Sequence, residues 1–189
     1  MATREKLIQA GLNLFHRHGI HLVGMDRVLR KAGVTKTTFY NYFESKEHFA
    51  CAVIDRFGEE LHSRIYYRLE GAHEASAEQR LLRVFDAWDE LFDNDSFRGC
   101  LLVGASVACG DKHDPTRKAA IRNKRALLDL YEEIARQSGI SNPAQFAIRF
   151  GVLVDGLLVA RHLYGDQREV KEARKMAVEM IANALKDSQ

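Results

Sequence analysis

Apolar residues recur at helical spacing along almost the whole chain. In the first segment Leu7, Ala10, Leu14 and Phe15 fall on one stripe, and Gly19 ends it. The rest of the chain divides in the same way, with Ser, Thr, Asn and Pro as starting signals and Gly as a stop. The predicted helices cover approximately residues 7–18, 25–32, 35–43, 46–68, 81–92, 99–110, 115–138, 143–164 and 170–185. The pattern predicts an all-α fold of about nine helices, and no segment convincingly predicts a strand.

Two of these segments are unusually apolar. Residues 99–110 carry no charge, which predicts a helix buried on most of its sides. Residues 143–164 are apolar around most of the circumference, and Asp155 interrupts them. A helix of the second kind needs cover on more than one face, so its pattern favours packing against another subunit over an ordinary core.

Composition limits the class of protein. Of the 189 residues, 46% are hydrophobic and 29% are charged, which is the mix of a soluble protein with a real core. Two prolines are too few for the many turns of an all-β fold. Apolar runs fall short of the ~20 residues of a membrane span, and no signal-peptide pattern precedes them, so we expect a cytoplasmic protein without membrane contact. Cys51, Cys100 and Cys109 lie far apart, which disfavours a disulfide or zinc framework.

Positive charge is concentrated at the N-terminal end. Residues 1–50 hold eight Lys or Arg against four Asp or Glu, a net charge of +4, whereas the remainder holds 20 against 22. Four histidines add to the first segment. This asymmetry favours a polyanionic partner for the first quarter of the chain, although chance asymmetry is the simpler alternative.

The order of the first short helices indicates a helix-turn-helix motif. One helix ends at Ala32-Gly33-Val34, and a second begins at Thr35 or Lys36 after a short turn. In this motif the glycine permits the turn, the valine fills the angle between the helices, and the second helix projects outward to enter the major groove of DNA.

The second helix of the motif carries small polar residues that suit this role. Lys36 can donate to guanine, and its neighbouring threonines can contact thymine methyl groups or phosphates. Tyr40, Tyr42 and Lys46 offer donors to phosphate oxygens. The candidate DNA-binding residues are Thr35, Lys36, Thr37, Thr38, Tyr40, Asn41, Tyr42 and Lys46. Phe39 and Phe43, between them, are expected in the core.

Residues 24–47, GMDRVLRKAGVTKTTFYNYFESKE, closely resemble the N-terminal signature of the TetR family of bacterial transcriptional regulators. The family pattern runs A-G-V-[ST], then [LF]-Y-x-[HY]-F, then x-[SN]-K-E. The residues that match it are Ala32, Gly33, Val34, Thr35, Phe39, Tyr40, Tyr42, Phe43, Ser45, Lys46 and Glu47. The later half is similar to one TetR subgroup through Phe97-x-Gly99-Cys100 and Asp155-Gly156.

The resemblance implies a homodimer with a DNA-binding head at residues 1–47 and a ligand-binding and dimerisation body at residues 48–189. It places Lys36, Thr37 and Tyr40 where family members contact bases or the nearby backbone, and Tyr42 and Lys46 where they contact phosphates. One departure is Asp26, which occupies a position where many members carry threonine or a basic residue, so we leave it out of the contacts. The implied function is a repressor that leaves a palindromic operator when a small apolar or amphipathic molecule binds.

An aromatic lining for that small molecule can be assembled from several predicted helices. The candidate ligand-binding residues are Phe57, Leu61, Phe85, Trp88, Phe92, Leu102, Tyr131 and Asp155. For the apolar members, ordinary core packing is the alternative. A buried carboxylate needs a donor, so Asp155 could face a ligand amine, an arginine across the dimer or a helix terminus.

Small and apolar residues of the last two helices suit tight packing between subunits. The candidate dimer-interface residues are Gly151, Leu153, Gly156, Leu157, Ala160, Ala177, Met180 and Ile181. The alternative is a core within one subunit.

Catalytic and metal-binding patterns find little support. His16-x-His18-x-x-His21 has neither i, i+4 spacing nor carboxylate or cysteine ligands beside it. No G-x-S-x-G, phosphate-cradling glycine loop or H-E-x-x-H occurs. We therefore expect no enzyme, no metal and no cofactor. Two alternatives to ligand control stay open: a regulator without an effector, and a redox sensor that uses Cys100 or Cys109.

Overall fold

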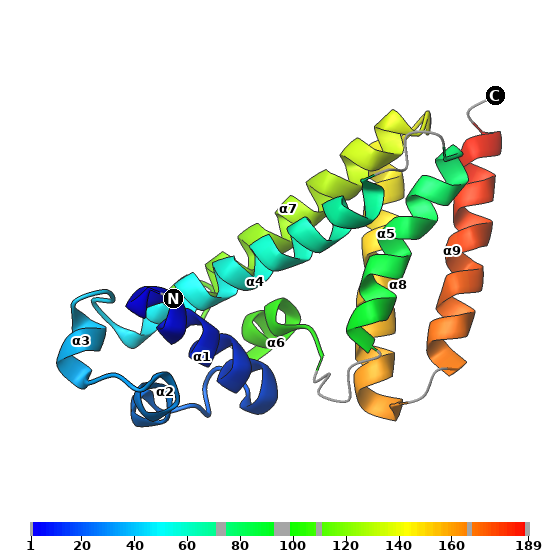
Figure 1. The fold of residues 1–189 in the computed structure, drawn as a ribbon. Coiled ribbons are helices and arrows are strands. Elements are labelled where there is room, and N and C mark those ends of the chain that lie inside the picture. The colour runs from blue at the N-terminus through cyan, green and yellow to red at the C-terminus, as the bar shows by residue number, and fades with distance from the viewer. Residues whose placement is uncertain (1, 71–74, 93–98, 109–110, 166–167, 188–189) are drawn as a thin grey trace. The chain divides into compact units, whose positions relative to one another are not determined.

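The computed structural model describes residues 2–70, 75–92, 99–108, 111–165 and 168–187, and within these ranges the chain is helical without strands (Figure 1). The helices are α1 (Thr3–His18), α2 (Met25–Ala32), α3 (Lys36–Tyr40), α4 (Lys46–Leu69), α5 (Ala77–Phe92), α6 (Leu101–Ala108), α7 (Pro115–Gln137), α8 (Pro143–Tyr164) and α9 (Arg168–Lys186). The predicted all-α fold is confirmed.

Contacts group the chain into two compact units. The first contains Met1–Glu60 and Arg98–Lys124, and the second contains Leu61–Phe97 and Arg125–Gln189. The first unit therefore includes most of α4, all of α6 and the beginning of α7 in addition to α1–α3. The predicted boundary at residue 47 separates a DNA-binding part from a ligand-binding and dimerisation part, and the two compact units do not test it. It stays a prediction.

The core of the first unit is built where α1 approaches α4 closely. Leu7, Leu14 and Phe15, on the predicted stripe of α1, are buried. Gly11 lies on the same face, and a Cβ there would meet Val53 Cγ2 at 2.6 Å and Phe49 Cζ at 2.7 Å. Real Cβ contacts are not that short, so glycine is what allows the two helices to pack at this distance.

A polar contact joins α4 to α7 within the same unit. Asp55 accepts hydrogen bonds from Arg122 Nη2 at 2.6 Å and from Asn123 Nδ2 at 2.7 Å. Asn123 also donates to the carbonyl oxygen of Ala119 at 2.9 Å. Gly58 leaves the space that the Asn123 amide fills, because a Cβ at residue 58 would overlap that amide.

Helix α6 corrects the expectation for residues 99–110. Leu101, Leu102 and Ala105 are buried, but Gly104 and Ala108 are exposed and Val107 is 78% exposed. Only one face of this eight-residue helix is covered. An uncharged segment can be buried without leaving a charge unpaired, but its lack of charge does not show how many faces of the helix are buried.

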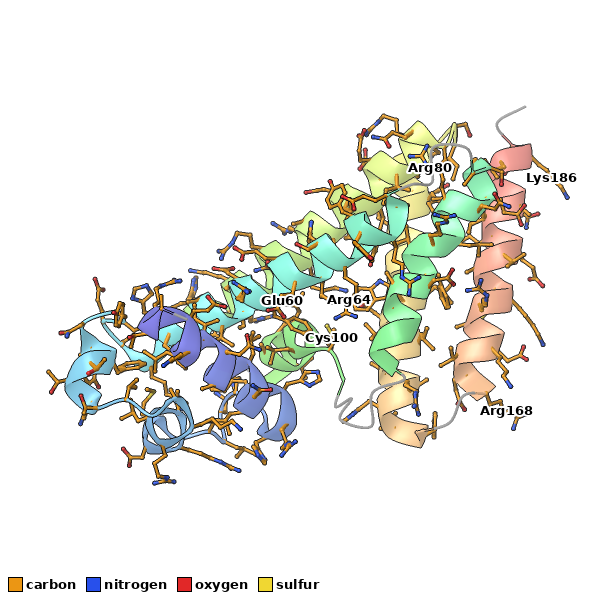
Figure 2. All side chains as sticks on the ribbon, viewed as in Figure 1. Glu60, Arg64, Arg80, Cys100, Arg168 and Lys186 are labelled. Carbon is orange, nitrogen blue, oxygen red and sulfur yellow. The ribbon has the colours of Figure 1, made fainter. Side chains whose placement is uncertain are left out.

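In the second unit α5, α8 and α9 pack side by side (Figure 1). Arg174 of α9 forms an ion pair with Asp86 of α5. Arg80, near the start of α5, donates to Gln137 Oε1 of α7 at 3.0 Å. Helix α9 begins at Arg168 and ends at Lys186, and these residues and Arg80 are labelled in Figure 2.

By length and composition alone, α8 could cross a membrane. The expectation that apolar segments fall short of this length was therefore too strict for residues 143–164. Arg149, Asp155 and Arg161 divide the helix, and it packs against α9 and α5. The core helix of a soluble protein has the same features, so α8 by itself gives no indication of a membrane.

Candidate nucleic-acid interface

The turn between α2 and α3 has the geometry that the sequence predicts. Gly33 caps α2 in the left-handed conformation, at φ 67° and ψ 38°. Its N–H donates to the carbonyl oxygen of Arg30 at 3.3 Å, and the N–H of Val34 donates to that of Leu29 at 3.1 Å. A positive φ favours glycine because it lacks a Cβ, so this residue stops α2 and redirects the chain into α3.

Thr35 begins α3 as its N-cap. Its Oγ1 accepts a hydrogen bond from the N–H of Thr38 at 3.2 Å and lies 2.9 Å from the Thr38 hydroxyl oxygen. An N-cap of this kind satisfies a helical donor that would otherwise be unpaired. Thr38 is half-buried, whereas Thr35 is exposed. Both hydroxyl groups are thus engaged in holding the first turn of α3.

Aromatic packing anchors the inner side of α3. Phe39 and Phe43 are each 1% exposed, which confirms their predicted place in the core. Both rings meet Phe49 edge-on, with centroids at 5.4 Å and 5.0 Å, and Phe15 meets it at 5.7 Å. Edge-to-face pairs add to the stabilisation from buried area. A helix of five residues is too short to be stable alone, so this cluster fixes its position.

The outer side of α3 and the turn after it are exposed to solvent. Lys36, Thr37 and Asn41 are exposed, and Tyr40 and Tyr42 are 50% and 42% exposed. Tyr40 packs its ring against Phe39 at 5.3 Å, and half of its surface stays accessible. The structure therefore presents most of the predicted contact residues together, on one short helix and its C-terminal turn.

Helix α4 begins beside this surface. The hydroxyl oxygen of Ser45 accepts from the N–H of His48 at 3.0 Å, and the N–H of Glu44 donates to His48 Nδ1 at 3.3 Å. Lys46, the first residue of α4, is half-buried. Hydrogen bonds from its own backbone N–H and from Ser45 hold the pKa of Glu47 below its ordinary value, so this side chain is ionised next to Lys46.

The predicted ligand-binding residues fall in both units. Phe57 and Leu102 belong to the first unit; Leu61, Phe85, Trp88, Tyr131 and Asp155 belong to the second; the Phe92 side chain lies outside what the structure describes.

In the second unit an aromatic group gathers around Phe150. Trp88 Nε1 donates to the Tyr131 hydroxyl at 2.8 Å, and Phe150 meets Tyr131 at 5.2 Å and Phe85 at 6.4 Å. These four side chains are buried, and Asp155 is half-buried. The group forms part of the core of this unit, and a ligand role for it stays a prediction.

The predicted interface residues divide into two sets. Four are covered by the chain itself: Gly151, Leu157, Ala177 and Ile181. A Cβ on Gly151, for example, would lie 2.5 Å from Leu128 Cδ2. Leu153, Ala160 and Met180 are half-buried, and Gly156 is exposed.

The large apolar side chains that α8 exposes lie outside the eight candidate interface residues. They are Ile148, Val152, Val159, Leu163 and Tyr164, each between 47% and 69% exposed. Residues 148, 152, 159 and 163 follow one face of a helix, but α8 is apolar on its other faces as well, so this spacing did not single them out. The interface itself stays a prediction.

The cysteines and histidines of the predicted alternatives have ordinary surroundings. Cys100 is buried and Cys51 is half-buried, and burial raises the pKa of the Cys51 thiol. Cys109 lies outside the described residues. His16 Nε2 donates to the carbonyl oxygen of Gly99 at 3.0 Å. Among the described residues no group of three His, Cys, Asp or Glu could hold a metal ion.

Comparison with known proteins assigns both parts of the chain. Residues 7–53 match the family model of bacterial regulatory proteins of the tetR family, and residues 77–177 match that of the tetracyclin repressor-like C-terminal domain.

Individual relatives agree with these matches. The HTH-type transcriptional repressor NemR of Escherichia coli K12 is 29% identical over 141 residues, 74% of this chain and 70% of that protein. The HTH-type transcriptional regulator BetI of Escherichia coli O17:K52:H18 is 26% identical over 186 residues, 96% of this chain and 93% of that protein.

Solved structures show the same fold. A TetR-family regulator from Streptomyces coelicolor, SCO4454, superposes with a TM-score of 0.82 at 22% identity, covering 98% of this chain and 95% of that one. The reduced form of E. coli NemR gives 0.83 at 24% identity, covering 93% and 94%. The exposed α3, its helix-turn-helix support and the two family models lead to one assignment: the chain belongs to the TetR family of bacterial regulatory proteins and is a DNA-binding regulator.

Proposed function

We propose that this protein is a cytoplasmic, ligand-responsive transcriptional repressor that binds a palindromic operator as a homodimer. One observation carries the DNA-binding part of the proposal. Helix α3 is anchored from inside by Phe39 and Phe43, while Lys36, Thr37 and Tyr40 stay exposed on its outer side. An exposed polar helix on a rigid support is what entry into a major groove requires. In a dimer, two such helices would read half-sites about 34–36 Å apart.

Selection of bound sequences from a random duplex pool tests this part and returns the operator. We expect the selected sequences to be palindromic. Lys36→Ala should weaken binding to the selected operator by ~1–3 kcal/mol and relax the preference at one base pair. Lys118→Ala, at an exposed lysine of α7, is the matched control and should change neither property. If Lys36→Ala left affinity and base preference as in the wild type, α3 would not be the reading helix.

The homodimer rests on the apolar residues that α8 exposes. Val152 and Leu163 are 69% and 66% exposed, an unfavourable arrangement for a lone subunit in water. Val152→Asp should give a folded monomer in sedimentation velocity, because this side chain has little cover in its own subunit. A wild-type protein that sediments as a monomer at micromolar concentration would contradict the dimer.

The effector part of the proposal follows from the continuity of α4. This helix runs unbroken from Lys46, the proposed phosphate contact, through Phe57 and Leu61, which we propose as ligand contacts. A ligand that displaces α4 would move Lys46, and operator release then requires a higher ligand affinity for the state that cannot bind DNA. The name of NemR, a transcriptional repressor, favours repression.

Trp88 provides a direct test for a ligand because it is the only tryptophan of the chain. Apolar and amphipathic metabolites that enter the second unit should change its fluorescence and release the operator at the same concentration. If metabolites released the operator without changing the fluorescence of Trp88, the ligand site would lie elsewhere in the protein. Burial of Cys100 disfavours redox control through that thiol, and alkylation that leaves DNA binding intact would exclude redox control by either Cys100 or Cys109.

A further inference from the structure

The first unit contains a basic hollow that the sequence analysis did not identify and that lies outside α3. It has a volume of about 470 Å³ and is formed by the C-terminal half of α1 and by α2. Its lining residues are Asn13, Leu14, Arg17, His18, Arg27, Arg30 and Lys31. Four of these seven are permanently cationic, and none is acidic. We call this site the α1–α2 pocket.

The cations of the α1–α2 pocket have no carboxylate partner among the residues that the structure describes. Other arginines of the same unit do: Arg56 pairs with Glu5 at 3.0 Å, and Arg122 pairs with Asp55 at 2.6 Å. Four positive charges thus converge on one hollow without internal compensation, and a concave surface of one sign concentrates the field.

His18 adds no compensation, but it fixes one of the cations. Arg27 Nη2 donates to His18 Nε2 at 2.8 Å, so this ring nitrogen is an acceptor and the imidazole is neutral. Burial and the neighbouring Arg27 and Arg17 lower the pKa of His18, in agreement with that state. The contact orients Arg27 without neutralising it.

The helix dipole explains only part of this arrangement. Arg17, Arg30 and Lys31 lie in last turns, where cations are favourable on any helix. Arg27 lies in the first half of α2, where the dipole disfavours a cation, and the dipole does not require side chains from two helices to line one hollow. An anion with several oxygens, received by arginine forks, would satisfy all of them.

We propose that the α1–α2 pocket binds a phosphate group, and that in the DNA-bound regulator this phosphate belongs to the DNA backbone outside the groove that α3 enters. The inference rests on the proposed function. DNA is favoured as the source because α2 leads directly into α3 through the Gly33 cap, so the pocket belongs to the same compact unit as the proposed reading helix. The net charge of +4 in the first fifty residues also favours a negatively charged partner such as DNA. The pocket thus adds a sequence-independent contact to those of α3.

The test uses a long duplex of random sequence, because a phosphate contact does not depend on the operator. The variant is Arg30→Gln/Lys31→Gln, at two exposed positions of α2, and the control is Lys112→Gln/Lys118→Gln, at two exposed positions of the same unit. Circular dichroism verifies that all three proteins are folded. We expect the dependence of log affinity on log salt to be shallower by about 1 unit in the variant, and unchanged in the control.

Three results would overturn the proposal. Equal slopes for wild type and variant would exclude a backbone contact at the pocket, and equal losses in variant and control would show only a general charge effect. Titration with pyrophosphate distinguishes the other source of phosphate: binding that the variant loses, with unchanged DNA slopes, would assign the pocket to a free phosphorylated ligand. A wild type without any affinity for duplex DNA would instead refute the proposed function itself.

Discussion

Replacing Phe43 by alanine tests whether the aromatic cluster fixes the DNA-binding helix. The Phe43 ring is 1% exposed. Its centroid lies 5.0 Å, 5.3 Å and 5.7 Å from the ring centroids of Phe49, Phe39 and His48. The Arg4 guanidinium carbon lies 5.5 Å from the same centroid. Removal of a buried phenylalanine costs about 3–5 kcal/mol when the site cannot collapse. The neighbouring rings are themselves held by core packing, so little collapse is available. We expect a loss in this range.

Urea unfolding followed by circular dichroism measures the loss in free energy. Tyr42→Ala is the matched control, because the adjacent ring is 42% exposed and should cost less than about 1 kcal/mol. Both variants should bind DNA more weakly, but for different reasons: Phe43→Ala through disorder of α3, and Tyr42→Ala through a lost contact. If Phe43→Ala unfolded at the same urea concentration as the wild type, the cluster would not be what holds α3.

Three further changes have defined outcomes. Lys46→Ala should weaken binding to all duplexes equally and lower the salt slope by about 1 unit, measured by fluorescence anisotropy; a sequence-dependent loss would refute a phosphate contact. Tyr131→Phe leaves the buried Trp88 N–H without its acceptor, which should cost about 1–3 kcal/mol in urea unfolding and shift the Trp88 emission; unchanged stability and emission would contradict this hydrogen bond. Burial lowers the pKa of His62 although Asp129 opposes this, so the unfolded state binds the proton more readily than the folded state. The free energy of unfolding should therefore fall as pH drops below ~6.5, and it should fall by less in His62→Gln. Equal dependence of this free energy on pH in wild type and variant would refute the role of His62.

Local signals near the turn were strong enough to predict α2, Gly33, Thr35 and the inward side of α3. Each depends on residues a few positions apart, and the structure places the glycine, the cap and both phenylalanines as expected. The start of α5 shows a local signal that was passed over. The Ser76 hydroxyl oxygen accepts from the N–H of Gln79 at 3.2 Å, and the N–H of Ser76 donates to Gln79 Oε1 at 3.0 Å. This capping box begins the helix four residues before Leu81.

The sequence could not show which side of a uniformly apolar helix is buried and which side is exposed. Helix α8 is apolar on most sides, so sequence alone did not decide whether Gly151 or Val152 would be covered by the chain. The same applies to α6, where Val107 is exposed despite an uncharged segment. The α1–α2 pocket was missed for another reason: Arg17 and Arg30 belong to different helices, and their convergence depends on tertiary packing.

Gly58 has a consequence for how this protein can change over generations. A glycine in the middle of a 24-residue helix costs about 1 kcal/mol relative to alanine, and here the Asn123 amide fills the space that it leaves. Substitution at either position alone leaves a clash or a void beside Asp55. The two residues should therefore be exchanged as a pair, and descendants of this chain that carry a larger residue at 58 should carry a smaller one at 123.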